Sequence, residues 1–111
     1  AALGGVHPHT IENQPDGTMD LDCIENAIRD ASDVHQPRTR LICLENTHNA
    51  TGGVPLTAEY TQSVAELARS RSLRLHIDGA RIFDAAAALD VDPAELTAPA
   101  DSITFCLSKA L

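Results

Sequence analysis

The chain has few basic residues, no cysteine pair and no long apolar run. Its 111 residues contain 8 lysines and arginines against 16 aspartates and glutamates, which gives a net charge of −8. A net charge of this sign repels phosphate backbones, so the composition argues against nucleic acid as a partner. No apolar run approaches the ~20 residues that cross a bilayer, and residues 1–8 lack the charged and then apolar pattern of a secretory signal. We therefore expect a soluble protein with neither a nucleic-acid nor a membrane partner.

The sequence also offers few residues that could form a disulfide or bind a metal ion. Cys23, Cys43 and Cys106 are an odd number, lie far apart and form no C-x-x-C pair. They predict neither a disulfide framework nor a thiolate zinc site, and they fit the reducing cytoplasm. His7 and His9 form an H-x-H pair, but no third ligand stands at a usual spacing, so we predict no metal site.

The length suits one ordinary domain with a modest core. Residues 1–17 hold several glycines and prolines and show no sustained period, so we predict a loop or linker there. The chain begins without Met and ends at Leu111, directly behind an apolar strand. Such ends are typical of a piece of a longer protein, and we expect further chain on both sides.

The remaining chain alternates between apolar strands and amphipathic helices. We expect strands at residues 40–44, 73–77 and 102–107, and helices that begin near residues 21, 57 and 80. Asp20 or Thr18 would cap the first helix and Thr57 the second. This order predicts right-handed crossovers and a mostly parallel sheet. Because residues 40–44 (RLICL) form a compact apolar run, we expect helices on both faces of the sheet, which makes the fold class α/β.

Polar side chains follow each predicted strand. The first strand leads into residues 45–49 (ENTHN), the second ends at Asp78 with Arg81 three residues later, and the third leads to Ser108 and Lys109. The carboxyl ends of parallel strands meet at one edge of the sheet, where ligands bind in open α/β folds. We therefore expect a carboxylate, a guanidinium and an ammonium group at that edge.

Lys109 could serve as a nucleophile there, because a partly desolvated lysine loses some preference for its charged form and condenses with aldehydes. Pyridoxal phosphate is the cofactor that most often requires such a lysine, and it also requires a carboxylate on its pyridine nitrogen. Asp78 is placed for that role. An Asp-Gly pair is also common turn chemistry, and a strand-terminal lysine is often just a solvated charge, so the residue types alone leave both interpretations open.

Three stretches of the chain carry a resemblance to a known family. They read DVHQPRTRLICLENTHNATGGVPL, LHIDGARIFDAAAALDV and DSITFCLSKAL, and the preceding HPHTIENQPDGTMDLDCIENAIRD is similar to the family's lead-in. In this order they resemble the low-specificity L-threonine aldolases, which belong to the fold type I pyridoxal phosphate enzymes. The resemblance implies that residues 18–111 are part of the large, cofactor-binding domain of such an enzyme.

The resemblance also implies roles for individual residues. Lys109 in CLSK would carry pyridoxal phosphate, and Asp78 in HIDGAR would pair with its pyridine nitrogen. Arg81 would hold the substrate carboxylate, for which a bidentate guanidinium suits better than an ammonium group. His35 would lie near the substrate's β-hydroxyl and take part in proton transfer or orient that hydroxyl. The implied reaction cleaves L-threonine, L-allo-threonine and related β-hydroxy-α-amino acids to glycine and an aldehyde, in a homo-oligomer with sites between subunits.

Some features leave alternatives open. The family usually has glycine after the lysine, whereas Ala110 stands here, and alanine does not reach positive φ cheaply. The residues that stack on the ring and bind the phosphate are expected outside this segment, which would then be inactive alone. Another fold type I enzyme, such as a β-eliminating lyase or an aminotransferase, would share Asp78 and Lys109 without needing His35. A truncated, non-catalytic copy is the third hypothesis.

Overall fold

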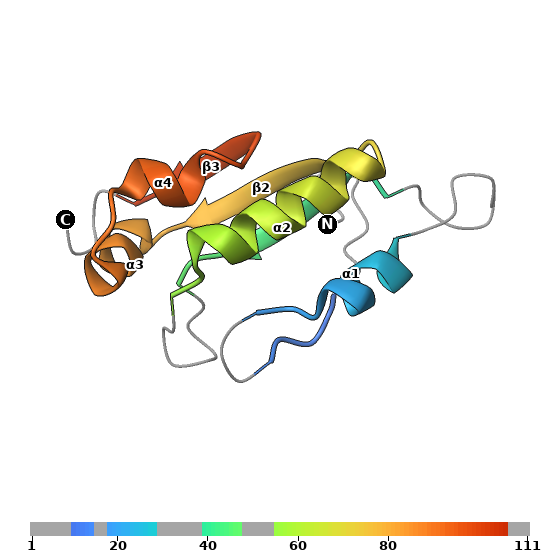
Figure 1. Ribbon diagram of the computed structural model, residues 1–111, viewed down its shortest axis with the longest axis horizontal. Helices are drawn as coiled ribbons and strands as arrows, with labels where there is room; N and C mark the ends of the chain where they lie inside the picture. Colours follow the sequence, from blue (N-terminus) through green and yellow to red (C-terminus); the bar gives the residue numbers. More distant parts are fainter. Residues whose placement is uncertain (1–9, 15–17, 29–38, 48–54, 107–111) are drawn as a thin grey trace.

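The computed structural model of the chain describes residues 10–14, 18–28, 39–47 and 55–106. Within these residues three strands and four helices follow one another along the chain (Figure 1). Their bounds are α1 (Leu21–Ala27), β1 (Leu41–Glu45), α2 (Ala58–Ser70), β2 (Arg74–Gly79), α3 (Ile82–Leu89), α4 (Pro93–Thr97) and β3 (Ser102–Phe105). No helix in this part of the chain is long and apolar enough to cross a membrane.

The three strands form one parallel sheet in the order β1-β2-β3. Strand β2 is central, and its Asp78 is paired with Glu45 of β1 on one side and Thr104 of β3 on the other. Parallel neighbours need a crossover connection, which α2 supplies between β1 and β2, and α3 with α4 between β2 and β3. The predicted parallel α/β sheet is confirmed.

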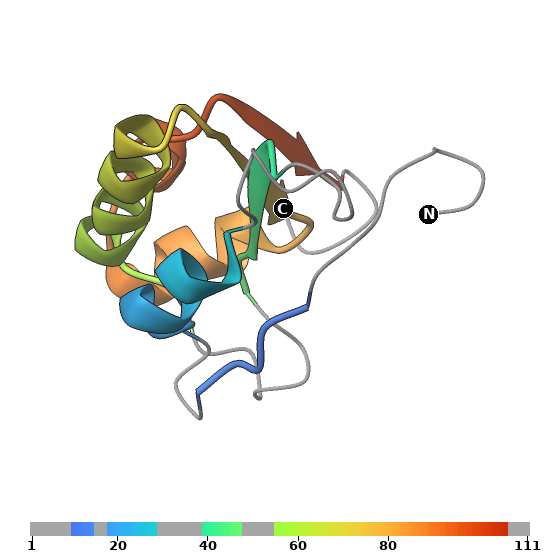
Figure 2. The same ribbon diagram turned by 90° about the vertical axis from the view of Figure 1, so that its right-hand side faces the viewer.

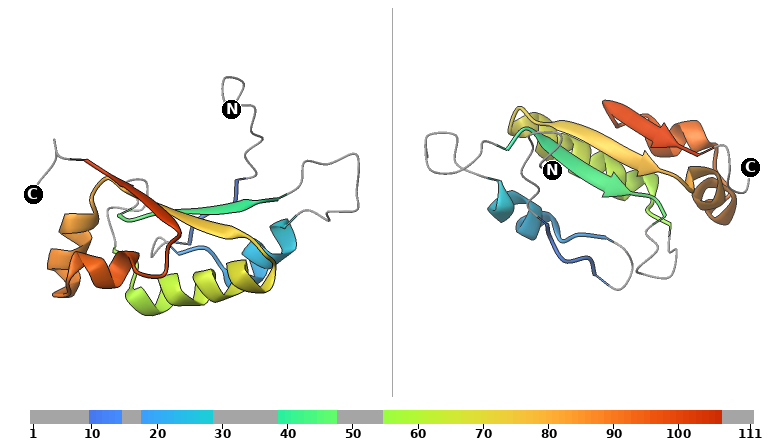
Figure 3. Two further views of the ribbon diagram at one scale, coloured as in Figure 1. Left: turned by 90° about the horizontal axis from the view of Figure 1, so that it is seen from above. Right: turned by 180° about the vertical axis from the view of Figure 1, so that it is seen from behind.

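The described helices cover one face of this sheet. Side chains alternate along the strands, so that Ile42 and Leu75 are buried with Val64 of α2, whereas Leu41 is 49% exposed. Figures 2 and 3 show the four helices on the same side of the strands. The opposite face carries Cys43 and Asp78, which are exposed. Helices on this second face stay a prediction for the whole domain.

Capping residues start the first two helices where the sequence predicts them. The Asp20 carboxylate accepts hydrogen bonds from the backbone N–H groups of Asp22 and Cys23, at 2.8 and 3.4 Å. The Thr57 hydroxyl accepts one from the N–H of Tyr60 at 3.1 Å. These bonds satisfy donors that the first turn of a helix leaves unpaired, and they confirm both predicted starts.

The connection from β2 to β3 differs in detail from the prediction. Helix α3 begins at Ile82 rather than near residue 80, because the chain first turns at the end of β2. Helix α4 was not predicted from the sequence. It has Pro93 in its first turn and Asp92 as the N-cap, and Asp92 Oδ1 accepts a hydrogen bond from the Ala94 N–H at 2.9 Å. Leu96 of α4 is fully buried against α3 and completes a second, smaller core.

Candidate functional site

The carboxyl end of β2 carries the candidate site. Asp78 lies one residue before the end of this central strand, and its side chain is exposed on the face that the described helices leave open. Its Oδ1 accepts a hydrogen bond from the Ala80 N–H at 3.2 Å, which turns the chain away from the sheet toward α3. The side chain is thus fixed at one oxygen and open toward the edge where parallel sheets bind ligands.

Arg81 lies at the N-cap position of α3, three residues after Asp78. Its side chain is exposed and makes no capping hydrogen bond to the helix. The structure therefore places Asp78 and Arg81 at the same edge of the sheet, where the sequence predicts them. Asp78 and Arg81 are the two predicted site residues that lie in the described part of the chain.

The negative charge of Asp78 changes the pKa of a neighbouring thiol, that of Cys43. Cys43 faces the same side of the sheet as Asp78, from the adjacent strand β1. Although Cys43 is exposed as a residue, its thiol is partly shielded from water by neighbouring atoms, and this desolvation raises the pKa of the thiol. The nearby negative charge of Asp78 raises that pKa further. The thiol is therefore kept neutral at neutral pH, which argues against a nucleophilic Cys43.

Gly79 explains how β3 can lie so close to the site. A Cβ atom built on Gly79 would lie 2.9 Å from the carbonyl oxygen of Thr104, 3.1 Å from the Cβ of Ile82 and 3.2 Å from Cδ1 of Ile103. The first of these atoms belongs to the backbone of β3 and cannot rotate away. Glycine is thus required directly after Asp78 for β2, β3 and α3 to meet.

Asn46 is a residue of this edge to which the sequence reading gave no role. It follows β1 directly, its side chain is 1% exposed, and its backbone N–H donates to the carbonyl oxygen of Asp78 at 3.0 Å. The signal in the sequence was only its place in ENTHN, since a polar residue after a strand is typical of an exposed loop. Its burial depends on contacts that are distant in sequence.

His76 lies on β2, two residues before Asp78. Its Nδ1 is 2.7 Å from the hydroxyl oxygen of Ser102 on β3, its paired residue in the sheet. This hydrogen bond links β2 to β3 on the open face. Cys106 is half-buried just after β3.

Two predicted site residues, Lys109 and His35, lie outside the described part of the chain. Other residues that the sequence singles out also lie outside it, namely His7, His9, His48, Asn49 and Ala110. Strand β3 ends at Phe105 rather than at the predicted residue 107. The roles proposed for Lys109 and His35 therefore stay predictions.

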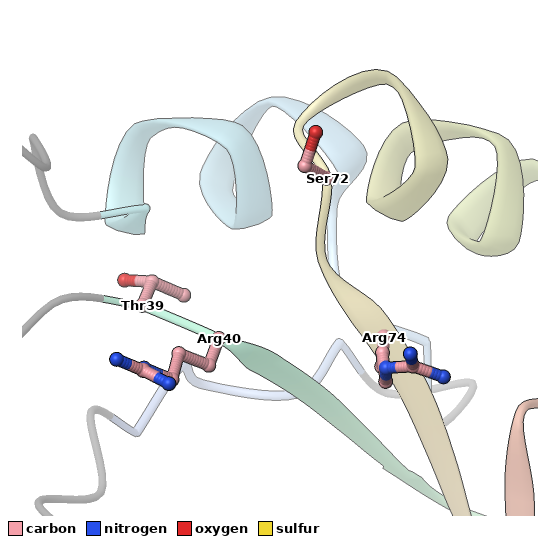
Figure 4. A pocket seen from close by; sticks show the side chains of 4 residues that line it. All are labelled: Thr39, Arg40, Ser72 and Arg74. Atoms are coloured by element: carbon pink, nitrogen blue, oxygen red, sulfur yellow. The ribbon is translucent and has the colours of Figure 1, made fainter.

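A pocket of about 300 Å³ lies at the opposite edge of the sheet, where β1 and β2 begin, and Thr39, Arg40, Ser72 and Arg74 line it (Figure 4). It does not coincide with the edge that carries Asp78. In Figure 4 the guanidinium groups of Arg40 and Arg74 point away from each other, so they do not converge on one anion. The polar residues at the end of β2 are therefore the better candidate site.

Fold and site together define an α/β domain that presents a carboxylate and a guanidinium at the carboxyl edge of a parallel sheet. Over its whole length, residues 1–111, the chain matches the family model described as beta-eliminating lyase, and it belongs to that family.

The chain is also similar to proteins of known name. It is 54% identical over its whole length to low-specificity L-threonine aldolase 1 of Arabidopsis thaliana, of which it covers 31%. It is 45% identical over its whole length to the low specificity L-threonine aldolase of Escherichia coli K12, of which it covers 32%. Over 84 residues, 76% of the chain, it is 38% identical to the low specificity L-threonine aldolase of Saccharomyces cerevisiae, covering 21% of it. The predicted resemblance is confirmed, and the chain spans at most about a third of the length of these relatives.

Proposed function

We propose that the chain is part of a pyridoxal-phosphate-dependent aldolase, which cleaves L-threonine, L-allo-threonine and related β-hydroxy-α-amino acids to glycine and an aldehyde. The names of the relatives support the reaction, since low-specificity L-threonine aldolases match the chain from end to end. The structural observation that carries the proposal is the exposed carboxylate of Asp78 at the end of the central strand, with Arg81 three residues later.

The residues at this edge suit the cofactor. A protonated pyridine nitrogen needs an accessible carboxylate as its partner, and only one hydrogen bond from the chain, that of Ala80 N–H, is seen on the Asp78 carboxylate in the described residues. Within the same residues no arginine forms an ion pair with Asp78, so its charge is available to a bound cation. Lys109 would hold the cofactor covalently from the chain that follows β3.

Each side chain then has a separate task. Bound pyridoxal phosphate supplies an electron sink for the cleavage of the bond between Cα and Cβ. Asp78 keeps the ring nitrogen protonated, and Arg81 binds the substrate carboxylate with a two-pronged, charge-assisted hydrogen bond that fixes the amino acid's orientation. His35 takes up the proton of the substrate's β-hydroxyl, directly or through a water molecule, or orients that hydroxyl.

A second candidate function is β-elimination, because the matching family model is described as beta-eliminating lyase. Such an enzyme would share Asp78 and Lys109 but would release a β-substituent instead of an aldehyde. The names of the relatives favour the aldolase. We further propose that the full-length protein acts in the cytoplasm as a homo-oligomer, which the resemblance to the family supports.

Lys109 gives this proposal a sharp chemical test, because it is the only lysine among the 111 residues. The full-length protein is loaded with pyridoxal phosphate, reduced with borohydride and mapped by peptide mass spectrometry. We expect the reduced adduct on the peptide that contains Lys109. We expect Lys109→Ala to abolish both this adduct and the visible absorption band of protein-bound pyridoxal phosphate. An adduct on a lysine elsewhere in the protein would contradict the assignment.

Product analysis separates the two candidate reactions. With L-threonine as substrate, the aldolase yields glycine and acetaldehyde in equal amounts, whereas β-elimination yields ammonia and a 2-oxo acid. Lys109→Ala serves as the control, because it removes the proposed anchor and no other side chain. Ammonia and a 2-oxo acid without glycine would overturn the aldolase proposal in favour of the lyase.

A further inference from the structure

Asn46 is a buried amide with both of its polar ends paired. Its Nδ2 donates to the carbonyl oxygen of Leu56 at 3.2 Å, and its Oδ1 accepts from the N–H of the same residue at 3.0 Å. Leu56 lies outside every strand and is 2% exposed, so its two backbone groups have little access to water. The side chain of Asn46 thus pairs both backbone groups of Leu56, as the backbone of a neighbouring strand would.

The backbone of Asn46 faces the candidate site. Its N–H donates to the carbonyl oxygen of Asp78 at 3.0 Å, which extends the pairing of β1 with β2 beyond Glu45. On the other side of β2, Asp78 is paired with Thr104 of β3. The backbone of Asp78 is therefore held from both neighbouring strands.

Asn46 consequently joins the start of α2 to the end of β2 at the site. Leu56 packs into the core that Ile77 of β2 also joins, and it precedes Thr57, the N-cap of α2. Because the side chain of Asn46 is tied to Leu56, the end of β1 is held against the start of α2, and its N–H is held against Asp78. An aspartate here would lack the donor for the Leu56 carbonyl group, and a leucine would lack both partners.

We propose that Asn46 is a positioning residue, which sets Asp78 where its carboxylate meets the ring nitrogen of the cofactor. The assignment rests on the proposed function, because it takes Asp78 as the partner of that nitrogen. Asn46 itself contacts neither substrate nor cofactor in this role, and acts through the backbone of Asp78.

The test compares Asn46 variants of the full-length protein with a matched control. Asn46→Ala removes both side-chain hydrogen bonds, and Asn46→Asp keeps only the acceptor for the Leu56 N–H. Thr61→Val is the control, because Thr61 is likewise 1% exposed and loses one hydrogen bond, to the carbonyl oxygen of Thr57 at 3.0 Å, without touching Asp78. Thermal unfolding shows how much stability each variant has lost.

Two readouts then report on Asp78 rather than on stability. Titration of the cofactor-free protein with pyridoxal phosphate, followed by visible absorption, gives its dissociation constant. We expect that constant to rise on the order of 10- to 100-fold for Asn46→Ala, as for other residues that orient a ligand's direct partner, and less for Asn46→Asp. The ¹⁵N resonance of ring-labelled pyridoxal phosphate should move toward the unprotonated value in Asn46→Ala. Thr61→Val should keep the wild-type constant and resonance.

The outcomes separate this inference from the proposed function. A wild-type protein that takes up no pyridoxal phosphate overturns both. A wild-type protein that binds it, together with an Asn46→Ala variant of equal affinity and unchanged ¹⁵N resonance, overturns only the positioning role. Equal weakening in Asn46→Ala and Thr61→Val also overturns it, because a general loss of stability then explains the effect. If Asn46→Ala does not fold, Asn46→Asp decides between the same outcomes.

Discussion

Replacing Gly79 with alanine should destabilise the protein at the edge that carries the site. The added Cβ would lie 2.9 Å from the carbonyl oxygen of Thr104, closer than real Cβ contacts come, and 3.1 and 3.2 Å from carbons of Ile82 and Ile103. Removing this overlap requires β3 to move away from β2, because the Thr104 carbonyl group belongs to the backbone and cannot change rotamer. The same movement would shift the backbone of Asp78, the preceding residue.

The magnitude follows from two opposing terms. Overpacking a tightly packed position costs about 1–3 kcal/mol. The alanine also restricts the unfolded chain, which returns about 0.4–1 kcal/mol to the folded state. The difference between these two terms is ~0–2.6 kcal/mol. We therefore expect Gly79→Ala to lower the free energy of unfolding of the full-length protein by about 1.3 kcal/mol, the midpoint of that range, and to weaken the proposed binding of pyridoxal phosphate through the displaced Asp78.

Denaturant unfolding and cofactor titration measure the two effects. Ser70→Thr is the control, because it also adds one carbon but does so at an exposed residue at the end of α2. Its free energy of unfolding should stay within ~0.5 kcal/mol of the wild type. If Gly79→Ala is as stable as Ser70→Thr and binds the cofactor with unchanged affinity, the reasoning about space between β2 and β3 is wrong.

Two further predictions concern Tyr60 and Cys43. The Tyr60 hydroxyl donates to the Met19 carbonyl oxygen at 2.7 Å and accepts from the Met19 N–H at 2.8 Å. Tyr60→Phe should therefore lower the free energy of unfolding, measured with denaturant, by about 1–3 kcal/mol. A decrease below ~0.5 kcal/mol would contradict this prediction. Asp78→Asn should lower the raised pKa of Cys43 and so speed its alkylation by iodoacetamide at neutral pH, because more thiolate is then present. Burial is the larger cause of the raised pKa, so the rise should be modest, and an unchanged rate across the pH range would show that Asp78 does not act on this thiol.

The order of elements follows from the sequence because each signal is local. Thr57 and Asp20 cap helices through bonds to residues two or three positions away, and apolar periodicity shows which side of α2 packs. The short helix α4 was missed although Asp92 and Pro93 are ordinary start signals, because five residues carry too little periodicity. Asp78 and Arg81 were predicted at the carboxyl edge of the sheet because Asp78 lies at the end of an apolar strand and Arg81 follows it three residues later.

The sequence by itself determined the parallel α/β class, the two helix caps and the place of Asp78 and Arg81, since these depend on neighbours along the chain. Only the tertiary structure decided that β2 is central and that Gly79 has no room for a side chain. It also decided that Asn46 is buried with its amide on Leu56, ten residues away, and its N–H on Asp78, which is farther still. Such contacts depend on how strands and helices pack in space, and residue type and spacing do not encode them locally.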